Sequence, residues 1–143
     1  MSLKFILAGL PGSGKDTQAA RLSERLGIPS FSMGDVLREE IARGTETGRL
    51  VAPFVERGEI IPAGVAGKLM SDRLGDPSVQ ATGYVCNGYP RSVESFRQYL
   101  AWESPTAVII LDVPRDVAKN RLLARGRNDD TEDVIANRFR AYD

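Results

Sequence analysis

The chain has 143 residues, and its 19 Lys and Arg residues balance 19 Asp and Glu residues, so the formal net charge is zero at pH 7. This length suits one domain with a sizeable core, and the balanced charge argues against nucleic acid or an anionic membrane as a partner. Histidine is absent, which excludes an imidazole base and a histidine-bound metal. The N-terminus does not resemble a signal peptide and no apolar stretch could span a bilayer, so we expect a cytoplasmic protein.

Short apolar runs alternate with segments of helical periodicity, a pattern typical of an α/β fold with a parallel sheet flanked by helices. Strands are predicted at residues 3–8, 30–32, 84–86 and 107–111. Helices are predicted at about 15–26, 34–43, 46–57, 63–74, 115–124 and 132–142, and Phe96, Tyr99 and Leu100 indicate the apolar face of one more. The run Ala107–Leu111 is continuous and β-branched, as in a strand covered on both faces. The one cysteine, Cys86, ends an apolar run, and we interpret it as a core residue rather than a nucleophile.

A glycine-rich segment joins the first predicted strand to the first helix. Its spacing, Gly9-x4-Gly14-Lys15, lets backbone N–H groups converge on one anion, and the following helix directs its positive end at the same point. A simple glycine-rich turn is the alternative, but the strand–loop–helix context favours a phosphate-binding loop. Asp16 stands where Ser or Thr is usual, and Thr17 comes one place later. The residues expected to bind ATP here are Gly12, Ser13, Gly14, Lys15, Asp16 and Thr17.

Arginines gather beside the predicted turns. Arg91 follows a strand at its carboxyl end, where open α/β sheets bind ligands, and Arg121 and Arg125 share one helical face. Arg127 precedes Asn128-Asp129-Asp130, and Arg138 lies on the helix that follows. Any one of these arginines alone reads as a solvated surface residue, but together with the loop they predict a phosphate site. Asp129 and Asp130 either stabilise the N-terminus of the following helix through its dipole or fix a hinge at this point in the chain.

With these segments in place, the sequence resembles the adenylate kinase family of nucleoside monophosphate (NMP) kinases from residue 3 to its end. The resemblance implies a parallel sheet of five strands, of which four are visible here, in one kinase domain over 1–143. It implies a core at 1–32 and 63–125, an NMP-binding clamp at about 33–62, a minimal lid at about 125–131 and a final helix at about 132–142. The matching segments are Gly9–Gln18, Ser32–Arg38, Gly58–Pro62, Gly88–Arg91, Asp112–Pro114 and Arg127–Asp130.

The resemblance also implies a reaction, ATP + AMP = 2 ADP, with Mg²⁺ as cofactor and a monomeric protein that binds ATP and an NMP. The charges implied around the transferring phosphoryl group are Lys15, Arg91, Arg125, Arg127 and Arg138, with Arg121 beside the donor adenine. The residues implied at the acceptor are Ser32, Met33, Arg38, Val55, Glu59, Ile60, Ile61, Gly88, Arg91 and Ser95. No cysteine set for a structural zinc is present.

Several positions depart from the family pattern. Met33 and Ser95 replace the usual Thr and Gln at the AMP base, so UMP, CMP or a deoxynucleotide stays open as the acceptor. Asn87 replaces an Asp that, in the family, helps to hold Mg²⁺ through water. Asp16 either supplies the carboxylate that is missing at residue 87 or only stabilises the N-terminus of its helix through the helix dipole. The family's last strand and closing helix are not seen, which leaves a non-catalytic nucleotide-binding module as a further alternative. The expected strand order 2-3-1-4 exposes Ala107–Leu111, so we expect either a truncated chain or a partner chain that covers this edge.

Overall fold

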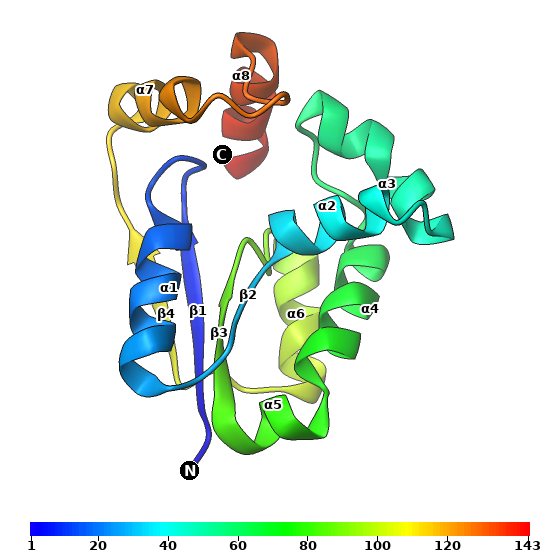
Figure 1. Ribbon diagram of the computed structural model, residues 1–143, viewed down its shortest axis with the longest axis vertical. Coiled ribbons are helices and arrows are strands. Elements are labelled where there is room, and N and C mark those ends of the chain that lie inside the picture. The colour runs from blue at the N-terminus through cyan, green and yellow to red at the C-terminus, as the bar shows by residue number, and fades with distance from the viewer.

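The computed structural model describes all residues 1–143 as a parallel four-stranded sheet flanked by helices (Figure 1). The strands are β1 (Leu3–Gly9), β2 (Ser30–Ser32), β3 (Gly83–Asn87) and β4 (Ala107–Leu111). Their order is β2-β3-β1-β4, as the family resemblance implied. In register, Ile6 lies beside Cys86 on one side and Val108 on the other. Because every pair is parallel, the carboxyl ends of all four strands meet at one edge of the sheet.

Eight helices connect and cover the strands. They are α1 (Lys15–Leu26), α2 (Met33–Ala42), α3 (Glu46–Arg57), α4 (Ala63–Leu74), α5 (Pro77–Thr82), α6 (Val93–Trp102), α7 (Arg115–Arg125) and α8 (Glu132–Tyr142). Seven lie where the sequence predicted them, and α5 was not predicted. The sequence does contain signals for the start of α5. The Asp76 carboxylate accepts a hydrogen bond from the Ser78 N–H at 2.8 Å, and Pro77 takes the first helical position. None of the helices is long and apolar enough to cross a membrane.

The two sheet faces bury different clusters, because side chains alternate along a strand. On one face, Leu7 of β1 packs with Ala19 of α1 and Val85 of β3. On the other face, Ile6 and Cys86 belong to the larger core that includes Tyr99 of α6. This places α1 and α6 on opposite faces, as right-handed crossovers in opposite directions require. Cys86 is fully buried, as expected of a core residue, and burial raises the pKa of its thiol to about 12.

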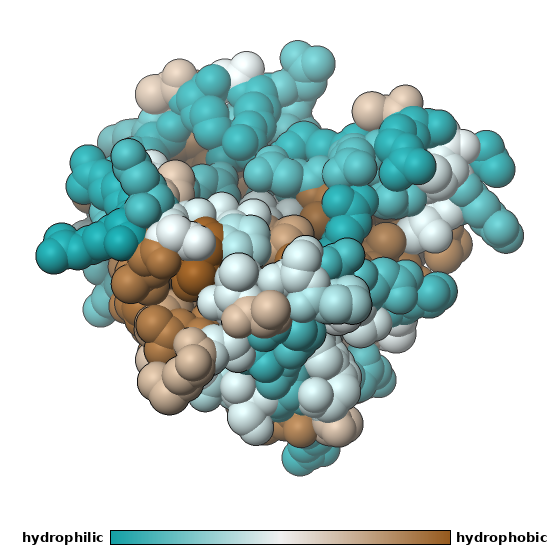
Figure 2. Space-filling model, turned by 60° about the horizontal axis from the view of Figure 1, so that its bottom comes forward, coloured by the Kyte–Doolittle hydropathy of each residue, from teal (hydrophilic) through white to brown (hydrophobic).

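Strand β4 differs from its prediction. Its run of β-branched residues indicated a strand covered on both faces, but Val108, Ile109 and Ile110 are 44%, 36% and 66% exposed. The reason is its place in the sheet: β4 forms one edge, pairs with β1 alone, and no helix packs extensively over its faces. Figure 2 shows apolar side chains gathered on this side of the molecule. The expected exposure of the β4 edge is confirmed, and such an edge is a template for pairing with another chain.

We predict that the 143-residue chain self-associates through β4. Ile110→Lys places a charge on its most exposed side chain and should shift the mass measured by light scattering toward that of a monomer. Leu50→Lys, which adds the same charge at an exposed apolar position on α3, serves as the control and should leave the mass unchanged. A wild-type chain that stays monomeric at high concentration would contradict this prediction.

Candidate active site

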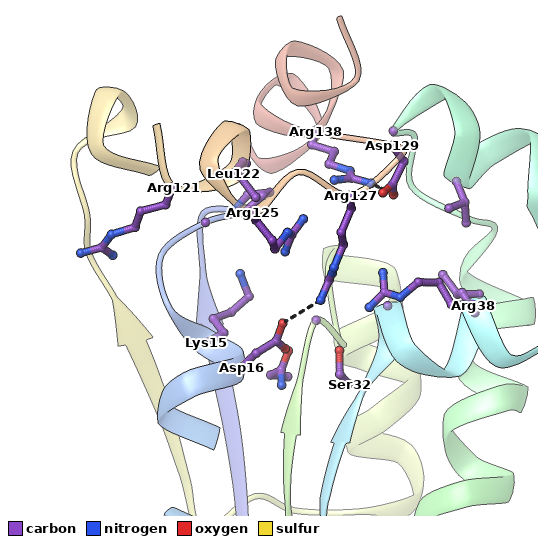
Figure 3. A pocket seen from close by; sticks show the side chains of 18 of the residues that line it. Lys15, Asp16, Ser32, Arg38, Arg121, Leu122, Arg125, Arg127, Asp129 and Arg138 are labelled. Carbon is purple, nitrogen blue, oxygen red and sulfur yellow. Dashed lines mark hydrogen bonds and ion pairs between the residues drawn. The ribbon is translucent and has the colours of Figure 1, made fainter. Parts of the chain in front are cut away.

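A cleft of about 410 Å³ opens at the carboxyl edge of the sheet, between the loop after β1, helix α2, the end of α3 and helices α7 and α8 (Figure 3). Its lining is strongly basic, with one lysine and six arginines. Most residues that the sequence predicted for the site line this cleft: Gly12, Gly14, Lys15, Asp16, Thr17, Ser32, Arg38, Val55, Glu59, Asn87, Gly88, Arg91, Arg121, Arg125, Arg127 and Arg138. Segments more than 100 residues apart in the sequence therefore form one site.

The loop after β1 is held close to α7. Gly12 has φ +83°, and a Cβ on it would lie 2.4 Å from the Ala118 carbonyl oxygen, so only glycine allows this approach. The loop leads directly into α1 at Lys15, which directs the N–H groups of the first helical turn into the cleft. The Lys15 ammonium donates to the carbonyl oxygens of Gly9 and Leu10 at 2.8 and 3.0 Å. These contacts fold the lysine over the loop, beside the space where a phosphate would lie.

The cleft lowers the proton affinity of Lys15. Burial lowers its pKa from the ordinary 10.5 to about 8, the charge of Arg91 adds to the effect, and Asp16 opposes it. The pKa of Arg91 is lowered in the same way, by desolvation between the cleft walls and by the charge of Arg138. These shifts show that the cations are crowded together. An anion bound among them would relieve this repulsion.

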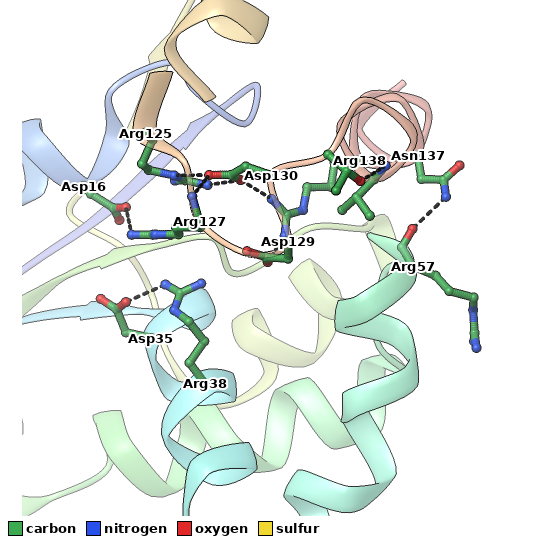
Figure 4. Close-up of polar contacts among 12 residues, drawn as sticks. Asp16, Asp35, Arg38, Arg57, Arg125, Arg127, Asp129, Asp130, Asn137 and Arg138 are labelled. Atoms are coloured by element: carbon green, nitrogen blue, oxygen red, sulfur yellow. Dashed lines mark hydrogen bonds and ion pairs between the residues drawn. The ribbon is translucent and has the colours of Figure 1, made fainter. Parts of the chain in front are cut away.

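The carboxylate of Asp130 organises the arginines of α7 and α8 (Figure 4). Arg125 donates to it through Nε at 2.8 Å and through its terminal nitrogen at 2.6 Å, and Arg138 donates at 3.2 Å. The backbone N–H of Arg127 donates to the same carboxylate at 3.1 Å. Burial would raise the pKa of Asp130, but the hydrogen bonds from Arg125 and Arg127 outweigh it and the pKa is lowered. Asp130 thus holds α7, the turn after it and α8 together. Asp129 also contributes, because it pairs with Arg138.

The remaining arginines are held less firmly. Arg38 pairs with Asp35 at 2.5 Å, but the two side chains are 37% and 68% exposed, so water weakens the attraction. Arg127 has its terminal nitrogen 4.0 Å from a carboxylate oxygen of Asp16, across the cleft. The Arg121 guanidinium lies about 4.0 Å from the point where a Gly14 Cβ would be, at the flank of the loop. These side chains remain available to a ligand.

Five predicted residues do not line the cleft. Met33 is 3% exposed and packs in the main core, and Ile61 is also buried. Ile60 faces a second hollow beside α6. Ser13 is buried, and its hydroxyl has no hydrogen-bond partner. Ser95 is buried within the cap of α6.

The position of Ser95 explains its short side chain. Its hydroxyl accepts hydrogen bonds from the backbone N–H groups of Arg91 and Ser92 at 3.0 and 2.9 Å, and Ser92 caps the Ser95 N–H in return. This capping box fixes the start of α6 and orients the segment that carries Arg91. The Ser95 hydroxyl therefore bonds to backbone N–H groups at the start of α6.

Six further residues line the cleft that the sequence did not assign to it. They are Pro11, Gly34, Leu37, Gly58, Leu122 and Asp129. Leu37 and Leu122 are buried apolar residues of helices, and nothing in such a residue distinguishes a cleft wall from the core. Gly58 lies where α3 meets α8, a contact between segments about 80 residues apart that no local pattern reveals.

The phosphate-binding loop, the parallel sheet and the basic cleft define a nucleotide-binding phosphotransferase of the phosphate-loop class. The sequence profile of the adenylate kinase family matches residues 7–143. The chain is 44% identical to an adenylate kinase of Mycolicibacterium vanbaalenii and 41% identical to one of Nocardia farcinica. Each alignment covers 98% of this chain and 80% of the relative. The chain belongs to the adenylate kinase family, and it is a nucleoside monophosphate kinase.

We predict that ATP affinity falls as the pH rises through the pKa of Lys15, near 8. Only the protonated lysine attracts the phosphates, so the dissociation constant should increase roughly twentyfold between pH 7.5 and 9.5. Calorimetric titration with ATP would measure this change. Lys15→Arg is the control, because a guanidinium stays charged over this range and should flatten the profile. Equal pH profiles for the two proteins would contradict the assignment of Lys15.

Proposed function

We propose that this chain transfers the γ-phosphoryl group of ATP to AMP and yields two molecules of ADP. The observation that carries the proposal is the convergence of Lys15 with Arg91, Arg125 and Arg138 on one cleft. Phosphoryl transfer requires little covalent chemistry from the protein, so positioned positive charge supplies most of the rate. The loop N–H groups and Lys15 would hold the β- and γ-phosphates, and Arg91 and Arg38 the acceptor phosphate.

The proposed division of the chain into parts is based on which wall of the cleft each part forms. Residues 1–32 and 63–125 form the core, 33–62 the acceptor clamp and 125–131 a minimal lid, followed by the final helix at 132–142. This division is supported by the lining residues, because Ser32, Arg38, Val55 and Glu59 lie on one side of the cleft and Arg121, Arg125 and Arg127 come from the other. Acceptor and donor would enter from these two sides, with Lys15 between them.

The acceptor base is the less constrained part of the proposal. Met33 is packed in the core and the Ser95 hydroxyl is occupied in the α6 cap, so neither offers a free polar group to a base edge. A site without such a group discriminates weakly among bases. We therefore propose AMP as the best acceptor, with UMP, CMP or a deoxynucleotide as poorer alternatives. Membership of a kinase family favours these over a non-catalytic nucleotide-binding module.

We expect Lys15→Ala and Arg91→Ala each to reduce the turnover of AMP by about 10³-fold or more, because each removes a charge from the transferring group. A coupled assay with ATP and a panel of AMP, UMP, CMP and dAMP measures this loss and ranks the acceptors. Arg21→Ala, on the exposed surface of α1 outside the cleft, is the control. Normal turnover in either cleft variant, with unchanged circular dichroism, would refute the proposed reaction. A higher kcat/KM for UMP or CMP would replace AMP as the acceptor.

Magnesium is the cofactor proposed for this reaction, and the donors in the cleft suit it. Three carboxylates line the cleft, but Glu59 is bound by Arg57 at 3.0 Å and Asp129 by Arg138. Asp16 makes no hydrogen bond, and its one ion pair spans 4.0 Å, so its oxygens are the least committed. No group of three or more acidic, cysteine or histidine side chains could hold a metal ion by itself.

We propose that Asp16 supplies the carboxylate for Mg²⁺, with water between them, and that Asn87 contributes its amide oxygen in the same way. Magnesium retains several waters and favours hard anionic oxygen, so a carboxylate on the loop can replace one at the strand end. When bound, the ion would neutralise charge on the β- and γ-phosphates. The alternative is that Asp16 only stabilises α1 through the helix dipole, by about 0.3–1 kcal/mol.

Two substitutions distinguish these roles. If Asp16 serves the metal, Asp16→Gly should weaken Mn²⁺ binding to the complex with a non-hydrolysable ATP analogue, measured by electron paramagnetic resonance. The added change Asn87→Asp should restore it, because the carboxylate returns to the end of β3. If Asp16→Gly lowers only the thermal stability and leaves the metal titration unchanged, the dipole role holds and the metal role fails.

A further inference from the structure

The end of α3 and one face of α8 are in direct contact, although they lie about 80 residues apart in the sequence. The side-chain amide of Asn137 donates to the carbonyl oxygen of Arg57 at 2.7 Å (Figure 4). A Cβ on Gly58 would lie 2.6 Å from the Val134 carbonyl oxygen and 3.1 Å from Cγ of Arg138. Val134, Asn137 and Arg138 are spaced i, i+3 and i+4, so one face of α8 makes the whole contact.

The chemistry of this contact requires an amide at residue 137. The last carbonyls of a helix have no partner within it, and the Arg57 carbonyl receives its donor from Asn137 instead. The other end of the same amide, its oxygen, accepts a hydrogen bond from Arg140. This second bond orients the amide so that its nitrogen faces Arg57. Aspartate has the same size but no donor, so it could keep the bond from Arg140 and would lose the bond to α3.

The two sides of the contact belong to different parts of the cleft. On the α3 side, Val55, Gly58 and Glu59 line the proposed acceptor clamp. On the α8 side, the residue next to Asn137 is Arg138, which reaches Asp130 at 3.2 Å. Asp130 in turn holds Arg125 and the backbone of Arg127. The backbone between Asn137 and Arg138 therefore joins two sets of hydrogen bonds, one to the acceptor clamp and one to the arginines on the opposite side.

We infer that Asn137 is a positioning residue that couples the acceptor clamp to Arg138. Asn137 does not line the cleft and touches no reacting atom in the proposed reaction, on which this inference rests. It fixes the end of α3 against α8, so that the clamp and the Arg138 guanidinium take up one mutual arrangement. Loss of the bond frees the clamp to move relative to Arg138, which affects acceptor binding and transfer but not the loop that holds ATP.

Asn137→Asp tests this inference, with Asn120→Asp on the exposed surface of α7 as a control of equal charge change. We expect the KM for AMP to rise about three- to tenfold and kcat to fall by a similar factor, while the KM for ATP stays within twofold. Gly58→Ala should act in the same direction, because its Cβ would push α3 away from α8. A general loss of structure would instead change both KM values together, and that result would overturn the inference.

Hydrogen exchange gives a readout that does not depend on catalysis. Amides of residues 58–61 should exchange faster in Asn137→Asp than in wild type or Asn120→Asp, while those of β3 exchange at the same rate. Unchanged exchange together with unchanged kinetics would overturn the inference. If wild type fails to phosphorylate AMP but the exchange difference is present, the proposed reaction is refuted and the contact between clamp and α8 is supported.

Discussion

Mutual repulsion among cations is the constraint on which this structure depends. Six arginines and a lysine line a single cleft, and without counter-charges they would push the walls of the cleft apart. The protein supplies two kinds of counter-charge. Asp130, whose side chain has no exposed surface, pairs with both Arg125 and Arg138 and so ties α7 to α8. Asp16 and Asp35 are exposed and hold Arg127 and Arg38 loosely, so a phosphate can replace them.

The same repulsion prepares the cleft for its ligand. The pKa of Lys15 falls to about 8 because the lysine is buried near Arg91, so its charged form is disfavoured until an anion arrives. Binding of a polyphosphate would then restore the favourable electrostatics of several cations at once. In phosphoryl transfer such preorganised charge costs no rearrangement at the moment of reaction. The geometry of the cleft is therefore already that of a site for a highly charged anion.

The start of α6 and the edge of the sheet show what two local features of the sequence do in the fold. Ser95 is short because its hydroxyl closes the capping box at the start of α6, which in turn holds the segment of Arg91. Its hydroxyl thus fixes the backbone at Arg91 and Ser92 and is not free for other contacts. At the other side of the sheet, β4 keeps the apolar residues of a central strand but lies at the edge, so its burial requires a neighbour beyond the described sheet.

The sequence by itself determined the α/β class, the four strands and their order, seven of the eight helices, and most of the residues that line the cleft. The strands, helices and phosphate-binding loop depend on local signals, namely apolar periodicity and glycine spacing, whereas the strand order and most acceptor residues followed from the resemblance to the adenylate kinase family. Tertiary structure alone decided the exposure of β4, because burial depends on neighbours in space and not on the β-branched pattern of one strand. It also decided the burial of Met33, the role of Ser95 in a helix cap, and the convergence of Arg125, Arg127 and Arg138 on Asp130. The contact of Asn137 with Arg57 could not be predicted at all, since it joins two helix surfaces that only folding brings together.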